Sequence, residues 1–384
     1  MVNKKLQAAL NKVNKKAGKE VAFIAGQNTE RLKVKYYSTP SNDVNEMLVN
    51  GIARARIIEL AGEFSSGKTS FALQLIAHIQ KEKKAEAEAL GEKDYDFTTG
   101  WFETEESFDA EYAKMLGVDL SDDKFIYWDQ RDTSAEEGFD ILNSFVESGA
   151  FRMIIVNSVS GLVPKVEMND TIASNNIALT ARLLSKEFRV VTGSAAKNDC
   201  TLIFINQLRA TMNKYTPLES TGGNALRYYS SQRISMRKVK VGEKDPITAD
   251  EGVKINCSVL KNRCANTTNP YRRCSYYARY GKGIDNYVTL PEMLLRTEIV
   301  RQAGAWFRIE NENGDIETIA GEVCKWQGKN NMLESIMSNE ELLHELEYRL
   351  ANKYSDTGVS LSDDEIEEIK MDEVATDIEF SGEN

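Results

Sequence analysis

The sequence has no apolar run that approaches the ~20 residues of a membrane-spanning helix, although 41% of its 384 residues are hydrophobic. Its N-terminus is rich in lysine and contains no apolar segment of roughly 7–15 residues, so it is not a secretory signal. Charged residues make up 28% of the chain, an ordinary value for a globular protein. These features exclude a membrane protein, a secreted miniprotein and a wholly disordered chain. At roughly 150 residues per domain, we expect two or three domains.

Cysteine and histidine are also scarce. There are 5 cysteines and 2 histidines, and no two cysteines form a C-x-x-C pair. Widely spaced cysteines in odd number do not support a disulfide framework, and so few histidines do not support a structural zinc site. We therefore expect a cytoplasmic protein in a reducing compartment, with no membrane partner.

Negative charge is in excess, but it is concentrated at one end of the chain. The net charge of −11 comes from 48 basic and 59 acidic residues. Residues 363–384 carry −9 of this charge, which leaves about −2 for the rest of the chain. The overall acidity is therefore no argument against a nucleic-acid partner.

The pattern along the chain predicts an α/β fold. Short apolar runs alternate with helix-like segments, which is typical of βαβ units and a mostly parallel twisted sheet with helices on both faces. Three later segments indicate antiparallel strands that extend this sheet. The expected strands are 56–61, 100–103, 125–128, 153–156, 201–206, 231–241, 253–261 and 273–280, and the expected helices are 67–83, 107–116, 135–148 and 174–197.

Four parts are expected along the chain. Residues 1–50 combine a polar, irregular linker over 27–50 with a basic N-terminal helix that has an apolar face. Residues 51–288 form the α/β core. Residues 289–352 form a small α+β domain with a hairpin signal at 310–315, and residues 353–384 form an acidic tail that we expect to be disordered. The apolar face of the N-terminal helix consists of Leu6, Ala9, Leu10 and Val13.

The strongest motif is GEFSSGKT, which matches G-x-x-x-x-G-K-[ST] after an apolar strand and before a helical segment. In such a loop the backbone N–H groups and the helix N-terminus bind phosphates. Lys68 would reach the β- and γ-phosphates, and the Thr69 hydroxyl would ligate Mg²⁺. The residues expected to bind the nucleotide here are Gly62, Glu63, Phe64, Ser65, Ser66, Gly67, Lys68, Thr69 and Ser70.

Three other apolar strands end in polar residues, at the edge where open α/β sheets bind ligands. Glu103, Glu105 and Glu106 follow one strand, and position alone leaves open which carboxylate orients the attacking water. Asn157 ends another strand, where an Asp usually holds the Mg²⁺ shell; its amide can hydrogen-bond a metal-bound water but supplies no charge. Gln207 ends a third strand, where it can touch the γ-phosphate.

Together these segments resemble the bacterial RecA recombinases. GEFSSGKT, ETEESFDAEYAKMLGVDL, the strand ending in Asn157, FINQLR, ESTGGNALRYYSSQR and RYGKGID occur in the order of that family, and the resemblance runs from about residue 4 to about residue 307. It implies a RecA-like P-loop NTPase core with ATP and Mg²⁺ as cofactors. It also implies a helical homo-oligomeric filament on single-stranded DNA, with ATP at the subunit interface, that pairs this strand with a homologous duplex.

The resemblance further implies roles at the nucleotide. Glu105 matches the catalytic glutamate of the family, which selects it from the three neighbouring acids, and Gln207 matches the γ-phosphate sensor. Lys261 and Arg263 match two basic residues that reach the ATP of the neighbouring subunit, where they would neutralise the transferring phosphoryl group. The residues matched to the nucleotide beyond the phosphate loop are Asp109, Tyr112 and Tyr280.

DNA binding is implied for two loops and for the helix after the first loop. Ile177 and Met212 are the candidate apolar wedges between bases. Arg182 and Arg189 are seven residues apart, so they share a helix face that suits phosphate contacts. Single-strand-binding protein and loading factors are candidate partners. The two loops are 164–176 and 209–222, and the remaining DNA candidates are Arg209, Gly222, Gly223 and Asn224.

Departures from the family pattern concern the reaction and the filament interface. Asn157 stands where the family has Asp, and Glu63–Phe64 stands where it has Pro-Glu. Arg227 and Tyr228 replace a Lys-Phe pair near the filament interface. The second DNA loop is about two residues shorter than in the family.

The sequence therefore predicts a DNA-stimulated ATPase that catalyses homologous pairing and strand exchange. One alternative is a protein that binds ATP as a structural ligand and coats DNA with little turnover because of Asn157; Asn157→Asp should then raise turnover. A second alternative, a hexameric helicase with a RecA core, fits the ordered motifs less well, and a closed ring instead of an open filament would identify it.

Removal of residues 360–384 is expected to raise the affinity for duplex DNA at fixed salt, because an acidic tail competes with DNA for basic surfaces. Fluorescence anisotropy of a labelled duplex, titrated with the full-length and the truncated chain, measures this change. An unchanged affinity would mean that the tail serves solubility alone.

Overall fold

The computed structural model describes residues 4–130, 133–168, 177–210, 218–220, 224–243, 245–265, 272–311 and 313–356. The chain forms two compact units, residues 1–35 and 36–384. Of the predicted acidic tail, only residues up to 356 lie within the described part. Among the helices of this described part, none combines the length and the apolar composition needed to cross a membrane.

The first unit contains the predicted basic helix, α1 (Lys4–Ala17), followed by η1 (Ala25–Gln27) and α2 (Thr29–Leu32). No residue of α1 is buried, and Leu6 and Val13 on its apolar face are 50% and 48% exposed. The Asn14 amide fastens the segment that follows the helix, because Nδ2 donates to the carbonyl of Ala22 (2.8 Å) and Oδ1 accepts from the N–H of Val21 (2.9 Å). The prediction of a helix with an exposed lysine face is confirmed, and its apolar face is exposed as well.

The prediction of an irregular linker over residues 27–50 is wrong in part. This range contains α2, β1 (Tyr36–Tyr37) and α3 (Asn42–Leu48), and β1 pairs with β2 (Ile52–Ala53). Three apolar side chains of α3 are buried, those of Val44, Met47 and Leu48. The Ser41 hydroxyl caps the helix by accepting from the N–H of Val44. Two turns of helix are too short to show a clear period in a polar sequence, because the apolar residues occupy positions i, i+3 and i+4 only once.

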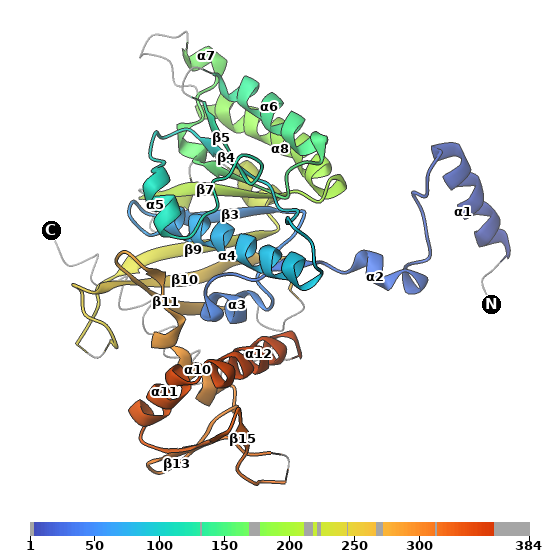
Figure 1. Cartoon of the computed structure of the whole chain (residues 1–384). Coiled ribbons are helices and arrows are strands. Elements are labelled where there is room, and N and C mark those ends of the chain that lie inside the picture. Colours follow the sequence, from blue (N-terminus) through green and yellow to red (C-terminus); the bar gives the residue numbers. More distant parts are fainter. Residues whose placement is uncertain are drawn as a thin grey trace. The chain divides into compact units, whose positions relative to one another are not determined.

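A ten-stranded sheet forms the centre of the second unit (Figure 1). Nine of its strands follow the order β12-β11-β10-β9-β3-β7-β6-β4-β5, and the tenth, β8, pairs with β7. The strands from β9 to β5 pair in parallel, and β10, β11 and β12 continue the sheet antiparallel. This arrangement confirms the predicted α/β sheet with its antiparallel extension. The strands are β3 (Ile57–Gly62), β4 (Thr99–Glu103), β5 (Phe125–Asp129), β6 (Met153–Asn157), β7 (Thr201–Ala210), β8 (Leu218–Ser220), β9 (Gln232–Val239), β10 (Gly252–Asn262), β11 (Arg273–Arg279) and β12 (Gly283–Ile284).

Helices cover the sheet. On one side α6 (Ala135–Ser148), α8 (Ile177–Lys197) and α9 (Asn224–Tyr229) share a hydrophobic cluster with β3, β4, β6 and β7. Within it the Phe188 ring contacts Phe139 and Phe204, with ring centroids 5.6 and 4.9 Å apart. The long helix α4 (Lys68–Ala89) crosses in front of the central strands in Figure 1, and its Phe71 contacts Tyr276 of β11. The shorter helices are α5 (Ala110–Met115), η2 (Val159–Gly161) and α7 (Lys165–Met168).

The C-terminal residues have a hydrophobic cluster of their own, which includes Phe307, Trp326 and Leu346. The hairpin predicted at 310–315 is confirmed by an antiparallel bridge between Glu310 and Ile316. Helices and short strands alternate here, as expected for an α+β segment, while the predicted domain boundaries at 50, 288 and 352 stay predictions. The elements are η3 (Asn286–Val288), α10 (Leu290–Arg296), β13 (Arg301–Ala303), β14 (Trp306–Arg308), β15 (Thr318–Ile319), β16 (Glu322–Val323), β17 (Lys325–Gln327), α11 (Lys329–Ser338) and α12 (Glu340–Asp356).

One ion pair is buried in the middle of the sheet. The Glu59 carboxylate of β3 is fully buried and pairs with the Arg233 guanidinium of β9, which is 8% exposed. The other carboxylate oxygen accepts from Nδ2 of Asn206 on β7 (2.9 Å). Three adjacent strands are thereby joined by one carboxylate.

Arg233→Leu is expected to lower the free energy of unfolding by about 3–5 kcal/mol, because it removes the guanidinium that pairs with the buried Glu59 carboxylate. Arg237→Leu, on the exposed part of the same strand, is the control and should change stability by less than about 0.5 kcal/mol. Urea denaturation of both variants measures the difference. Equal effects would contradict the role given to the buried pair.

Candidate functional site

The candidate site lies at one edge of the parallel sheet, where β3, β6 and β4 end and where β7 continues past Gln207 to Ala210. Gly62 at the end of β3 is level with Gln207 on β7, and Asn157 at the end of β6 is level with Glu103 at the end of β4. Because parallel strands carry their carboxyl ends to one edge, residues that are up to 145 positions apart (Gly62 and Gln207) meet there. The predicted strand-end residues therefore share one edge of the sheet.

The phosphate loop connects β3 to α4 through a tight turn. A Cβ atom on Gly62 would lie 2.3 Å from the carbonyl oxygen of Met236 and 2.4 Å from Ser66 Oγ, so only glycine fits. Ser65 and Gly67 have φ values of 57° and 84°, and Gly67 is the residue before the first turn of α4. This left-handed backbone is costly for most residues and natural for glycine. The loop directs the N-terminus of a 22-residue helix at the cavity described below.

Lys68 is the first residue of α4, and its side chain is buried (8% exposed). Its ammonium donates to the carbonyls of Gly62 (3.0 Å) and Glu63 (2.7 Å) and to Ser66 Oγ (3.2 Å). Burial lowers the pKa of Lys68 from its ordinary value, while the nearby carboxylates of Glu105 and Glu63 act in the opposite direction. A buried cation next to three oxygen acceptors is thus placed at the edge of the sheet.

A cavity of about 370 Å³ opens between the phosphate loop and the ends of β4, β6 and β7. Most of the residues that the sequence singled out for phosphate chemistry line it, and Ser107 and Ile205 line it without having been predicted. The lining residues are Phe64, Ser65, Ser66, Gly67, Lys68, Thr69, Ser70, Glu105, Ser107, Asn157, Ile205 and Gln207. The chain has thus gathered a lysine, a threonine, a carboxylate and two amides around one cavity.

The three neighbouring acids occupy different environments. Glu105 lines the cavity, and its Oε1 accepts from Gln207 Nε2 (3.0 Å), from Ser160 Oγ (3.1 Å) and from the Ser158 hydroxyl. Glu103 is buried (1% exposed) behind the lining, and Glu106 is exposed. Of the three, only the Glu105 carboxylate faces the cavity, so the geometry favours the candidate that the resemblance selected.

The residues at the cavity fit a hard cation such as Mg²⁺. The Thr69 hydroxyl lines the cavity, and Asn157 Oδ1 is a buried oxygen without a hydrogen-bond partner. Both are oxygen donors of the kind that Mg²⁺ prefers, either directly or through water. Among the described residues, no group of three or more His, Cys, Asp or Glu could hold a metal by itself. The fit therefore depends on ligands supplied by a bound phosphate, as is usual for Mg²⁺.

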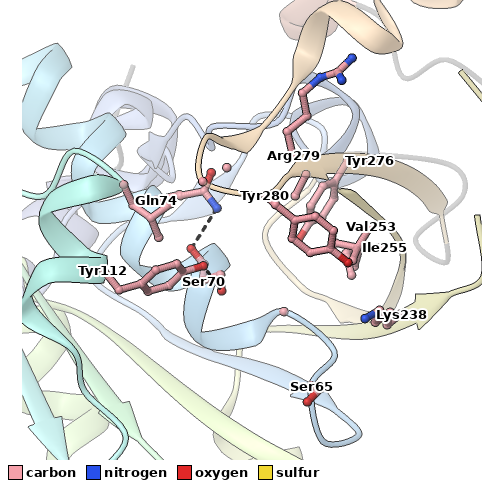
Figure 2. A pocket seen from close by; sticks show the side chains of 15 residues that line it. Ser65, Ser70, Gln74, Tyr112, Lys238, Val253, Ile255, Tyr276, Arg279 and Tyr280 are labelled. Atoms are coloured by element: carbon pink, nitrogen blue, oxygen red, sulfur yellow. Dashed lines mark hydrogen bonds between the residues drawn. The ribbon is translucent and has the colours of Figure 1, made fainter. Parts of the chain in front are cut away.

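A second cavity of about 210 Å³ adjoins the phosphate loop on its β10–β11 side. Figure 2 shows Tyr112 of α5 on one side of it and Tyr280 on the other. The Tyr112 hydroxyl donates to Ser70 Oγ (2.8 Å), which ties this wall to the phosphate loop. Asp109 is not among the lining residues; its carboxylate caps α5 by accepting from the N–H groups of Glu111 and Tyr112. Two tyrosines and a loop of phosphate-binding type suit the base and sugar of a nucleotide.

Comparisons with known proteins agree with this geometry. The family model described as the RecA N-terminal domain matches residues 4–285. A Protein RecA of Acinetobacter baumannii is 33% identical over 363 residues, which is 93% of this chain and 94% of the relative. A Protein RecA of Acinetobacter baylyi is 34% identical over 350 residues (90% of each chain), and one of Clostridium botulinum is 30% identical over 355 residues (92% and 90%).

The chain belongs to the RecA family. Its mostly parallel sheet, flanked by helices and extended by antiparallel strands, is the fold that this membership implies. The RecA match covers both the phosphate loop and the β10–β11 region that forms the second cavity.

Two basic candidates of the RecA pattern, Lys261 and Arg263, are not among the residues that line either cavity. Lys261 at the end of β10 donates to the carbonyls of Arg227 (2.8 Å) and Tyr228 (3.0 Å). Burial, together with the charges of Arg263 and Arg233, lowers the pKa of Lys261 to about 8. Arg263 is exposed. Within the described part of the chain, Lys261 is thus bound to backbone carbonyls of α9, at Arg227 and Tyr228.

The DNA candidates of the RecA pattern fall partly within the described chain. Arg182 and Arg189 are exposed on α8, and a hydrogen bond with Tyr229 raises the pKa of Arg189. Asn224 is the exposed first residue of α9. Ile177 is the first residue of α8, and Arg209 is the second-to-last residue of β7. Met212, Gly222 and Gly223 lie outside the described residues, as do most of the two predicted DNA loops.

Sequence reasoning missed the residues that hold the predicted ones in place. Ser158 and Ser160 donate to Glu105, and Ser107 accepts from Asn157 Nδ2 (3.0 Å). Serines next to strand ends are common, and nothing in their spacing marks them as partners. The one available signal was the placement of Ser158 directly after Asn157.

Glu105→Gln is expected to lower kcat for ATP hydrolysis by roughly 10²–10⁴-fold, because an amide cannot take a proton from the attacking water. The affinity for ATP should change little, since Glu105 is not part of the phosphate loop. Steady-state hydrolysis and binding of a fluorescent ATP analogue measure the two quantities. Glu106→Gln, the exposed neighbour, should behave like the unmodified protein, and an unchanged kcat for Glu105→Gln would contradict the assignment.

Proposed function

We propose that the protein is an ATP-dependent recombinase that forms helical filaments on single-stranded DNA and catalyses homologous pairing and strand exchange. The observation that carries the proposal is the cavity in which Lys68, Glu105 and Gln207 converge on the phosphate loop. The relatives described above bear the name Protein RecA, and membership of that family supports ATP binding, DNA binding and a role in recombination and repair.

In this proposal the reaction is hydrolysis of the γ-phosphate. Lys68 and the loop N–H groups would neutralise the phosphates. Thr69 and Asn157 would help to hold Mg²⁺, which would supply further positive charge at the phosphates when bound. Glu105 orients the attacking water and accepts its proton. The presence of Glu105 in the lining of the same cavity as Lys68 and Thr69 supports this role.

Gln207 supports a coupling between ATP and DNA. Its Nε2 donates to Glu105 (3.0 Å), and β7 continues from Gln207 to Ala210, which belongs to the second candidate DNA loop. A γ-phosphate that competes for the Gln207 amide would change the position of the Glu105 carboxylate. It would also change the position of β7, the strand that leads to the second candidate DNA loop. Binding of DNA and turnover of ATP would thus affect each other reciprocally.

A filament is supported by two features that a single chain leaves incomplete. Lys261 and Arg263 lie outside the cavities of their own chain, which suits a role at the nucleotide of a neighbouring copy. The apolar residues Leu6 and Val13 of α1 are half exposed, which suits packing against another subunit. The cytosolic location, the single-strand-binding protein and the loading factors stay predictions.

The second candidate is an ATP-bound coating protein with little turnover. The observation that favours it is Asn157, because the residue at the metal side of the cavity has no charge. This candidate shares the cavity and the DNA surface with the recombinase and differs in the rate of the chemical step.

Mg²⁺-dependent ATP hydrolysis, measured with and without single-stranded DNA, tests the proposal. We expect strong stimulation by DNA, and Lys68→Ala should abolish hydrolysis, which shows that the activity belongs to this site. No hydrolysis in either case, with DNA binding that still requires ATP, would favour the coating protein. DNA binding that is indifferent to ATP would contradict the coupling through Gln207.

A further inference from the structure

The carboxylate of Glu103 is buried directly behind the catalytic cavity. Glu103 is the last residue of β4, is 1% exposed and is not among the residues that line the cavity. Burying a carboxylate is unfavourable unless hydrogen bonds or opposite charges compensate it. The groups that surround Glu103 therefore show what its charge is used for.

The first oxygen of Glu103 holds the turn that carries Glu105. Oε1 accepts from the backbone N–H of Glu105 (2.9 Å) and from the N–H and hydroxyl of Ser107 (3.3 Å each). These bonds fix the backbone on both sides of residue 106. The direction in which the Glu105 side chain leaves the chain thus depends on Glu103.

The second oxygen of Glu103 orients Asn157. Oε2 accepts from Trp101 Nε1 (2.8 Å) and from Asn157 Nδ2 (3.1 Å). Because a carboxylate accepts and cannot donate, it selects the NH₂ side of the Asn157 amide. The other amide atom, Asn157 Oδ1, is buried and has no hydrogen-bond partner. Because Asn157 lines the cavity, this oxygen is free to accept a hydrogen bond from a group bound there.

We propose that Glu103 is a positioning residue of the ATPase site and that residue 157 is an amide because of Glu103. This inference rests on the proposed function, since it names the residue that aims Glu105 and Asn157 at the reaction. The negative charge at the ends of β4 and β6 is carried by Glu103, and Asn157 presents an oxygen to the cavity without adding a second charge. A carboxylate at position 157 would face Glu103 at hydrogen-bond distance and repel it.

Three variants test the pairing: Glu103→Gln, Asn157→Asp, and both together. Asn157→Asp alone is expected to lower the melting temperature of the nucleotide-free protein and to lower turnover, in contrast to the gain expected for a poorly hydrolysing coating protein. In the double variant, the amide introduced by Glu103→Gln can donate an N–H to the new carboxylate at position 157. The loss of melting temperature caused by Asn157→Asp should therefore be less than half as large in the Glu103→Gln background.

Glu103→Gln separates a positioning role from a structural one. It should lower kcat by about 10–100-fold, as is typical for residues that orient metal ligands, and raise the Mg²⁺ concentration for half-maximal binding of a fluorescent ATP analogue. The affinity for this analogue without Mg²⁺ should change less than about threefold, because the phosphate loop is untouched. Turnover is expressed per nucleotide-binding site, so that loss of folded protein does not count as loss of kcat. Glu106→Gln, an exposed carboxylate in the same turn, is the matched control and should change none of these quantities.

Two results would overturn the inference. One is a Glu103→Gln variant that melts earlier but keeps both the kcat per site and the Mg²⁺ requirement. The other is additive losses of melting temperature in the double variant. If the unmodified protein does not hydrolyse ATP, the proposed function fails, and the Mg²⁺ requirement and the melting temperatures decide the inference without turnover.

Discussion

The parallel pairing of β3, β7, β6 and β4 is the constraint on which the rest of the structure depends. Parallel strands end at one edge, and the register sets Gly62 beside Gln207 and Asn157 beside Glu103. The phosphate loop, the candidate base and the two amides are brought together by this pairing alone. The connections between the strands can then vary in length without moving the ends, which is why loops for DNA and helices for packing fit between them.

Two buried carboxylates connect these strands, Glu59 in the middle of the sheet and Glu103 at the edge, and both accept hydrogen bonds from neighbouring strands. Glu59 joins β3, β7 and β9 through Asn206 and Arg233, and Glu103 joins β4 to β6 through Asn157. Charges of this kind cost free energy to bury, so they stabilise a particular arrangement of partners more than they stabilise the fold. At the ends of the strands, that arrangement is what aims Glu105 and Asn157 at the cavity.

The amphipathic helix α1 and the pair Lys261 and Arg263 have a different character. No residue of α1 is buried, Lys261 donates to two backbone carbonyls, and neither Lys261 nor Arg263 is among the residues that line the two cavities described above. In the proposed filament both are used between copies. Assembly would then be part of the chemistry, because a nucleotide held by one subunit would meet the basic residues of the next.

The sequence by itself determined the main strands of the sheet, the long helices between them, the phosphate loop and the family, because these depend on local periodicity and on contiguous motifs. It missed the short elements, among them β8, β12 and α9. It also missed α3, because two turns of helix show too little periodicity. The spacing alone did not decide which of the three acids after β4 orients the attacking water. Only the tertiary structure separated these acids: Glu105 lines the cavity, Glu103 is buried behind it and Glu106 is exposed. The partners Ser158, Ser160 and Gln207 of Glu105 come from distant strand ends. These residues contact Glu105 because the strands pair, and no local pattern in the sequence indicates that pairing.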